Sequence, residues 1–382
     1  MSPTPLTLAA LLALAACGDD TAPTADQYPA VAAATTLDLG HPADYTRSSW
    51  PPFYTAQVLG QSNTPAGNPT TDRGATLGRV LFHDRHLSIN EAKSCASCHA
   101  QASGFSDPAQ FSLGFGGTER TTAHSMRLGN ARFYAAQEMF WDRRAASLEA
   151  QATQPIRNGI EMGFDDEHGG LDSLLTRMRG LPYYPELFAW VYGDSAITED
   201  RIQRALAQYV RSIVAADSKF DRAYASAYNP AAPGGGIGAD FPGFTAQENL
   251  GKSLFLRPVN QGGAGCAGCH VPPTFALAAN SGSNGLDAGE TRTFKSPSLK
   301  DVGVTGPYMH DGRFTTLGQV VGHYMRNVQE GPALDARLRG PGGAPQRLTF
   351  ATSDENAIVA FLLTLTDKSL PTDPRFTDPF RP

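Results

Sequence analysis

The stretch "KSCASCHAQASG", residues 93–104, places two cysteines and a histidine in the order C-x-x-C-H. The same order returns in "GAGCAGCHVPP", residues 263–273. These two stretches contain four of the five cysteines in the chain of 382 residues. We therefore expect the fold to be built around whatever these two groups hold.

Covalent haem attachment explains both groups. A disulfide across two residues closes a small strained loop, and disulfide scaffolds use more cysteines in shorter chains. Zinc and thioredoxin-like sites use C-x-x-C pairs, but neither needs a histidine after each pair. In c-type haem attachment, the cysteines bind the two vinyl groups and the histidine ligates the iron. We expect two c-type haems, held by Cys95, Cys98 and His99 and by Cys266, Cys269 and His270.

The first residues have the pattern of an export signal. An apolar run over 6–16 ends at L-A-A-C, a lipobox in which Cys17 would be acylated. Covalent haem attachment occurs outside the cytoplasm, so both features predict a periplasmic protein anchored to a membrane through the lipid at Cys17. An ordinary secretory signal is the alternative. Residues 18–36 are expected to form a flexible tether, and no later segment is apolar enough to span a bilayer.

Composition excludes one class of partner and indicates the fold class. The net charge is −6 and 18% of the residues are charged, so no basic surface for nucleic acid is expected. The 39 glycines and 28 prolines indicate long loops between short helices. No alternating run is long enough to predict a sheet. The prediction is a mainly α fold.

An internal repeat divides the chain. The pattern L-G-x-x-L-F occurs at residues 77–82 and again at 250–255, shortly before each C-x-x-C-H group. We therefore predict two cytochrome c-like domains, each enclosing one haem. A Gly- and Pro-rich linker at 229–243 separates them. The predicted division is 1–36 for signal and tether, 37–235 for the first haem domain and 236–382 for the second.

Two further helices are predicted from their caps and periodicity. The segment 197–216 has Thr198 as N-cap, and apolar residues follow it at helical spacing. The segment 353–366 has Ser353 as its predicted cap.

Together these stretches resemble the bacterial di-haem cytochrome c peroxidases and their MauG-type relatives. The resemblance covers most of the chain after residue 49. It rests on both C-x-x-C-H groups, on "LFHDRHLS" (81–88), on "MFWDRRAASLEAQATQPIRNGIEMG" (139–163) and on "SPSLKDVGVTGPYMHDGRFTTLGQVVGHY" (296–324). It implies a first haem that reacts with peroxide and a second that passes electrons.

The resemblance also implies roles for particular residues. Glu161 is expected as the distal acid/base, with Gln151 and Pro155 in the same distal pocket. Trp141 matches the tryptophan that lies between the haems. From the residue types alone, Glu161 would be read as a solvated carboxylate and Trp141 as core.

A calcium ion between the haems is a further expectation of the resemblance. Asn130 matches the side-chain ligand, and Thr305 and Pro307 match the residues that offer backbone carbonyls. Oxygen ligands of this kind suit calcium. Asn130 alone would be read as a turn residue.

The chain departs from the peroxidase pattern at two places. Phe115 stands where reductively activated members carry a displaceable histidine, so the first haem is expected to be five-coordinate at rest. His124 is the nearest histidine and is interpreted as part of the loop. At the second haem, Tyr324 stands where the peroxidases carry an axial methionine, as in MauG-type proteins. Met325 is the second candidate ligand, with His323 third and Met309 a poorer one.

Three functions follow as hypotheses. The first is an oxidoreductase of the cytochrome c peroxidase type, which reduces hydrogen peroxide with electrons from a small periplasmic cytochrome c or cupredoxin. The second is a MauG-type oxidase that uses peroxide to oxidise a protein side chain or another donor through a high-valent di-haem state. The third is a di-haem electron carrier, against which Glu161 and Gln151 argue because a carrier needs no distal acid. The family also allows a homodimer.

Overall fold

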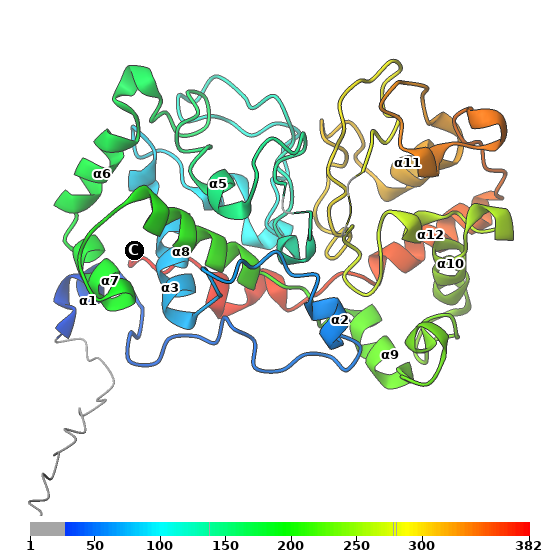
Figure 1. The fold of residues 1–382 in the computed structure, drawn as a ribbon, viewed down its shortest axis with the longest axis horizontal. Helices are drawn as coiled ribbons and strands as arrows, with labels where there is room; N and C mark the ends of the chain where they lie inside the picture. The colour runs from blue at the N-terminus through cyan, green and yellow to red at the C-terminus, as the bar shows by residue number, and fades with distance from the viewer. Residues whose placement is uncertain (1–26, 137, 278, 280) are drawn as a thin grey trace, which may run out of the picture.

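The chain folds into two lobes built from helices and long loops (Figure 1). The computed structural model describes residues 27–136, 138–277, 279 and 281–382, so Cys17 and the predicted export signal lie outside the described residues. Within the described part, the extended segments form only isolated β-bridges. The prediction of a mainly α fold is confirmed.

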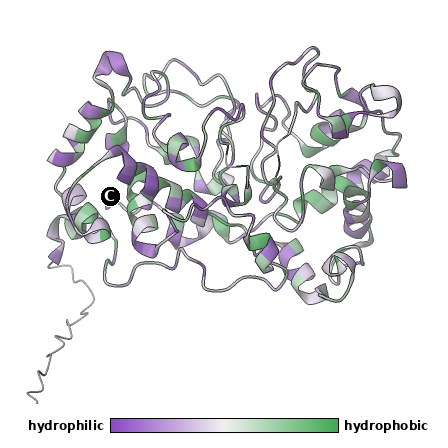
Figure 2. Cartoon of the chain, in the orientation of Figure 1, coloured by the Kyte–Doolittle hydropathy of each residue, from purple (hydrophilic) through white to green (hydrophobic). Residues whose placement is uncertain are grey.

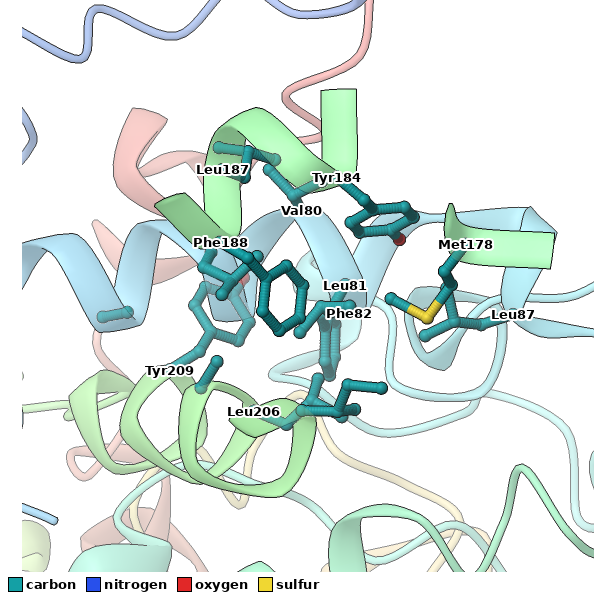
Figure 3. Close-up of a cluster of buried hydrophobic side chains, with 14 of the residues drawn as sticks. Val80, Leu81, Phe82, Leu87, Met178, Tyr184, Leu187, Phe188, Leu206 and Tyr209 are labelled. Carbon is teal, nitrogen blue, oxygen red and sulfur yellow. The ribbon is translucent and has the colours of Figure 1, made fainter. Parts of the chain in front are cut away.

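The first lobe packs helices from the N-terminal half around one apolar core. Its helices are α1 (Pro29–Ala34), α3 (Asp72–His83), α4 (Cys95–Cys98), α5 (Leu148–Ala152), α6 (Gly170–Gly180), α7 (Tyr183–Tyr192) and α8 (Glu199–Ser212). Figure 3 shows side chains of α3, α7 and α8 meeting in this core, among them Phe82, Phe188 and Tyr209. The ring of Phe82 lies 6.5 Å from the ring of His99, so the core reaches the first haem-attachment group.

The second lobe has its own core. It contains α2 (Ala56–Leu59), α9 (Lys219–Ala227), α10 (Ala246–Leu256), α11 (Leu317–Gly322) and α12 (Thr352–Leu363). Aromatic rings dominate this core, and Phe275 and Phe361 are fully buried in it. Figure 2 shows hydrophobic and hydrophilic segments alternating along the helices of both lobes, as expected for helices with one buried face.

The repeated L-G-x-x-L-F pattern has the same packing role in both lobes. Gly78 of α3 lies against α8, where a Cβ atom would be 2.1 Å from the carbonyl oxygen of Ala205. Gly251 of α10 lies against α12, where a Cβ atom would be 1.8 Å from the carbonyl oxygen of Ala357. Each glycine therefore permits two helix backbones to approach more closely than any side chain allows.

The tether predicted for 18–36 is too long. Residues 29–34 form α1, and Val31 is buried in the core of the first lobe. The Glu186 carboxylate of α7 accepts hydrogen bonds from the backbone N–H groups of Ala30 and Val31, at 3.2 and 3.0 Å. The apolar face of this short helix explains the difference, because it is covered by α7.

The predicted division at 235/236 does not separate the two cores, because the chain also crosses between the lobes at other places. Leu370 and Phe376, near the C-terminus, belong to the first core, while Phe53, Tyr54 and the segment 216–224 pack into the second. Figure 1 shows the C-terminal segment returning from α12 to the first lobe. Each core is thus completed by residues from the other half of the chain.

The predicted helix caps have different outcomes. Thr198 caps α8 as predicted, accepting a hydrogen bond from the backbone N–H of Arg201 at 3.3 Å. The cap predicted at Ser353 is wrong, because α12 begins at Thr352 and Ala351 is its N-cap. The Asp354 carboxylate accepts the Ala351 N–H at 3.1 Å, and among the described residues no side chain caps the first turn of α12, because alanine has no acceptor.

Candidate active site

The first C-x-x-C-H group presents its residues as a haem requires. Cys95 and Cys98 lie at the two ends of α4 and are free thiols. The Nδ1 atom of His99 lies 3.2 Å from the Phe105 carbonyl oxygen and 3.1 Å from Ser125 Oγ. Because a carbonyl can only accept, Nδ1 carries the proton, and Nε2 is left with a lone pair for iron.

The second group repeats this arrangement. Cys266 and Cys269 are free and line a large internal cavity together with His270. The Nδ1 atom of His270 lies 3.4 Å from Ser296 Oγ, which also lies 3.3 Å from the carbonyl oxygen of Cys269.

Burial keeps both groups neutral in the folded chain. It raises the pKa of Cys95 and Cys266 to about 12, and it lowers the pKa of His99 and His270 to about 4. A neutral imidazole with a free Nε2 beside two unpaired cysteines fits a covalently bound haem at each site. Bound haem would supply iron as the centre for redox chemistry.

Glu161 lies beside the first haem-attachment group. Burial is the main cause that raises the pKa of Cys95 and Cys98, and the charge of Glu161 adds to it at both thiols. Burial also raises the pKa of Glu161 itself, while the guanidinium of Arg144 opposes this. Among the described residues, its carboxylate accepts no hydrogen bond. Glu161 is therefore a partly buried acid near the expected haem, with a carboxyl group that has no hydrogen-bond partner among the described residues.

Gln151, Pro155 and Phe115 lie on elements next to Glu161. Gln151 is in α5, and Pro155 begins the turn in which the Asn158 side chain accepts the backbone N–H of Glu161 at 3.1 Å. The backbone N–H of Phe115 donates to the Ile160 carbonyl oxygen at 3.0 Å. The Phe115 ring packs against Gly163, where a Cβ atom would be 2.6 Å from the ring. A hydrocarbon ring thus occupies the loop position beside the Glu161 turn.

His124 lies next to the residues that contact His99. Its Nε2 atom is 3.3 Å from Ser106 Oγ and its Nδ1 atom is 3.2 Å from the Gln110 carbonyl oxygen. His124 directly precedes Ser125 in the chain, and the Ser125 hydroxyl contacts His99. Both ring nitrogens of His124 therefore have partners within the loop.

Trp141 lies between the two sites. It borders the cavity of the second site and also a small cavity that contains Ser125 and His124. Its Nε1–H donates to the His124 carbonyl oxygen at 2.7 Å. The Ser106 hydroxyl donates to the Ser125 carbonyl oxygen at 2.8 Å. A short series of hydrogen bonds and chain neighbours thus connects Trp141 with the histidine of the first site.

Tyr324 faces the cavity of the second site from a π-helical turn, His323–Asn327, that follows α11. Single π turns within helices are frequent at functional sites. Burial raises the pKa of Tyr324 to about 12, and Asn284 lowers it. The charges of Cys269 and Cys266 also act on it, which places the phenol close to the attachment cysteines.

The other candidate ligands are less available. Met325 also borders the cavity but is 1% exposed and packs in the second core. The His323 ring bonds to the Asn284 carbonyl oxygen at 3.1 Å and is not among the residues that line the cavity. Met309 accepts a hydrogen bond from the Asn284 amide at 3.3 Å. Among these candidates, Tyr324 is the one that borders the cavity and has the polar group least engaged by other contacts.

The predicted calcium ligands are only partly brought together. Thr305 and Pro307 line the small cavity beside Trp141. Asn130 is buried but does not line this cavity. Its Oδ1 accepts the backbone N–H of Ala215 at 2.8 Å, and its Nδ2 has no hydrogen-bond partner among the described residues. One oxygen lone pair of Asn130 is thus already used.

The sequence analysis missed the polar residues around the histidines and the cavity. Ser125 and Ser296 each lie 26 residues after the histidine that they contact, a shared spacing that an alignment of the two halves beyond the C-x-x-C-H groups would have shown. Arg127 and Lys295 line the second cavity. Burial lowers the pKa of Arg127 to about 10, so it stays a cation close to the expected haem, and lowers that of Lys295 to about 7, so Lys295 is only partly charged near neutral pH.

Comparison with known proteins agrees with this geometry. Residues 72–229 match the family model described as di-haem cytochrome c peroxidase. The methylamine utilization protein MauG of Methylorubrum extorquens is 33% identical over 316 residues, which cover 79% of this chain and 80% of that protein. The chain belongs to the di-haem cytochrome c peroxidase and MauG family. As a member of this family, it is a peroxide-reducing oxidoreductase with two c-type haems.

Other members extend the comparison. The cytochrome c551 peroxidase of Nitrosomonas europaea is 29% identical over 309 residues, covering 76% of this chain and 79% of that protein. A crystal structure of a MauG-like protein associated with microbial copper homeostasis superposes with a TM-score of 0.67 and 26% identity, covering 83% of this chain and 96% of the other. In the described part of the chain, no helix combines the length and the apolar character needed to cross a membrane.

Proposed function

We propose that this family member is a periplasmic peroxidase whose first site reduces hydrogen peroxide to water. The overall reaction consumes one peroxide, two electrons and two protons and gives two waters. The electrons would come from a small cytochrome c or cupredoxin and enter through the second site. The observation that carries the proposal is the carboxyl of Glu161 near Cys95 and Cys98, which is partly buried and has no hydrogen-bond partner among the described residues.

Glu161 has the position and the chemistry to move the proton. Cleavage of the peroxide bond needs a group that takes the proton from one oxygen and returns it to the other. A carboxyl whose pKa is raised by burial takes the proton more readily than a solvated one, and in its protonated form it can return that proton to the other oxygen. Gln151 in α5 would hold the peroxide, and Pro155 would shape the turn.

Phe115 supports a site that is ready at rest. Its side chain has no atom that can ligate iron, and both ring nitrogens of the nearby His124 already have partners, Ser106 and the Gln110 carbonyl. We therefore propose that peroxide reacts without prior reduction of the second haem.

Tyr324 favours a second candidate function, a MauG-type oxidase that uses peroxide to oxidise a protein side chain or another donor. A phenolate ligand stabilises oxidised iron more than a thioether does, which disfavours simple passage of electrons. The π-helical turn directs Tyr324 to the second cavity, and Met325 packs in the core.

Two further assignments stay with this proposal. A calcium ion held by the carbonyls of Thr305 and Pro307 and by Asn130 would connect the lobes, with the small cavity beside Trp141 as supporting observation. A lipid at Cys17 would tether the enzyme to the membrane surface, supported by the lipobox in the sequence.

The decisive experiment compares Glu161→Gln with Glu167→Gln. Glu167 is an exposed carboxylate of the same segment, so the control makes the same chemical change outside the site. We expect Glu161→Gln to slow the reaction of the oxidised protein with peroxide by about 10²- to 10⁴-fold, and Glu167→Gln to leave it unchanged. Stopped-flow absorption of the oxidised, unreduced protein measures this. Equal rates in both variants would remove Glu161 from the mechanism.

Electron paramagnetic resonance of Tyr324→Phe separates the two candidate functions. If Tyr324 ligates the second iron, the variant changes the low-spin ferric signal and leaves the high-spin signal of the first site as it was. An unchanged low-spin signal would exclude Tyr324 as the ligand, make Met325 the next candidate to test, and leave the electron-accepting peroxidase as the better candidate.

A further inference from the structure

Ser125 and Ser296 form a matched pair that links each proximal histidine to the backbone of its own attachment group. The Ser125 hydroxyl donates to the Cys98 carbonyl oxygen at 2.6 Å and lies 3.1 Å from His99 Nδ1. The Ser296 hydroxyl lies 3.3 Å from the Cys269 carbonyl oxygen and 3.4 Å from His270 Nδ1. The chain separation is identical in the two lobes, so both serines occupy the same structural position.

The hydroxyl orientation determines what the histidine does. The proton of Ser125 is committed to the Cys98 carbonyl, which leaves the lone pairs of Oγ to accept from His99 Nδ1–H. An imidazole that donates from Nδ1 becomes a more basic ligand at Nε2. A more basic ligand stabilises the oxidised iron relative to the reduced iron, and so lowers the reduction potential.

The two contacts differ in strength. The distance of 3.1 Å at Ser125 is within the ordinary range for N–H···O hydrogen bonds, while 3.4 Å at Ser296 is beyond it. The hydroxyl-to-carbonyl distance that orients each serine differs in the same sense. His99 has a second acceptor in the Phe105 carbonyl at 3.2 Å, and backbone groups at Phe275 and Pro297 act on His270.

We propose that Ser125 and Ser296 are positioning residues for the two proximal histidines, and that the closer contact of Ser125 makes His99 the more strongly donating ligand. The proposal rests on His99 and His270 as iron ligands, as in the proposed function. It adds that two sites with the same C-x-x-C-H pattern are given different reduction potentials by a serine hydroxyl that is distant in the sequence. A strongly donating proximal ligand suits the site that must cleave peroxide.

The test measures potentials, and therefore needs no peroxide activity. Ser125→Ala and Ser296→Ala remove the two hydroxyls, and Ser106→Ala is the matched control. Ser106 is a buried serine that bonds to the Ser125 carbonyl oxygen and to His124 but does not touch His99. The midpoint potential of each haem is measured by spectroelectrochemistry on protein with both haems attached. The iron–histidine stretch of the reduced first haem is recorded by resonance Raman spectroscopy.

We expect Ser125→Ala to raise the potential of the first haem and to lower its iron–histidine stretching frequency. Because the Phe105 carbonyl still accepts, the ferric-to-ferrous equilibrium should change less than tenfold, which is less than about 59 mV. Ser296→Ala should shift the second haem by a smaller amount, and Ser106→Ala should shift neither.

Three results would overturn the proposal: no shift in Ser125→Ala, an equal shift in Ser106→Ala, or a larger shift in Ser296→Ala. If Ser125→Ala does not acquire its haem, the pair Ser125→Thr and Ser125→Val decides, since the two side chains share a shape and only threonine keeps the hydroxyl. Shifted potentials in a protein without peroxide activity would overturn the proposed function alone.

Discussion

The two lobes hold their haem-attachment groups in the same frame but differ in the acidic side chains near them. In both lobes, a serine contacts the proximal histidine. Shortly after that serine, a backbone N–H donates to the carbonyl of the first aromatic residue that follows the histidine. The backbone N–H of Leu128 donates to the Phe105 carbonyl, and that of Leu299 donates to the Phe275 carbonyl, both at 3.2 Å. Glu161 lies near the first attachment group, and Tyr324 borders the cavity of the second. The two attachment frames are thus alike, while the acidic side chains near them differ.

The shared frame extends to one buried position in each lobe. Asn130 and Asp301 have left-handed backbone conformations, with φ of 60° and 62°. Oδ1 of Asn130 accepts the N–H of Ala215 at 2.8 Å, and Oδ1 of Asp301 accepts the N–H of Asp367 at 2.7 Å. The remaining polar atom of each side chain is buried without a partner. The lobes thus differ here only by an amide in place of a carboxyl group.

The largest effect is expected where the lobes are most alike. Gly78→Ala and Gly251→Ala each place a Cβ atom about 2 Å from a backbone oxygen of the partner helix, so the helices must separate. We expect each to lower the free energy of unfolding by at least about 3 kcal/mol, measured by thermal denaturation of the haem-loaded protein.

Gly180→Ala is the control for this pair. Gly180 ends α6 and has open space around it, so alanine should be neutral or should stabilise by up to about 1 kcal/mol. A tolerated alanine at only one of the two motif glycines would show that the lobes do not share this packing.

A pH profile should distinguish the two sites next. Partial burial raises the pKa of Glu161, and only its ionised form can take a proton from peroxide. The rate with peroxide should therefore rise with pH through a pKa above the ordinary value of a glutamate. Below that pKa it should fall about tenfold per pH unit. Stopped-flow measurements across the acidic range test this, and Glu161→Gln should abolish the dependence. A profile that persists in Glu161→Gln would assign the titration to another group.

The smallest effect is expected from Asp301→Asn, which gives the buried position of the second lobe the same side chain as Asn130 in the first. Burial raises the pKa of Asp301 to about 7, so the folded state holds a proton that the unfolded state releases at lower pH. The stability that this proton contributes is fully present below the unfolded pKa and is lost as the pH rises through about 7. Asp301→Asn should therefore remove a loss of about 1 to 3 kcal/mol between pH 5 and 8.

Asp240→Asn, which alters an exposed carboxyl, should keep the wild-type dependence on pH. The measurement is the melting temperature of the haem-loaded protein at each pH. The same loss of stability in Asp301→Asn as in wild type would mean that Asp301 is ionised and stabilised in the folded protein.

The sequence predicted what adjacent residues determine. Two C-x-x-C-H groups indicated the haems and the two lobes, because the chemistry of attachment is local, and Thr198 indicated the start of α8 for the same reason. Ser125 and Ser296 were not predicted, since their contacts depend on the path of a loop of 26 residues. The packing of Phe376 in the first core was not predicted either. It lies in a Pro-rich segment without periodicity, and only the tertiary structure gives it a partner.

The returning C-terminal segment bears on how the enzyme is made. The Phe376 ring lies within 5.8 to 6.1 Å of the rings of Phe105, Tyr209 and Tyr45, so it closes the core next to the first attachment group. During synthesis, nearly all of this sequence must be made before this ring can take its place. Until then the core of the first lobe is incomplete. The core beside Cys95 and Cys98 is therefore completed only after almost all of this sequence has been synthesised.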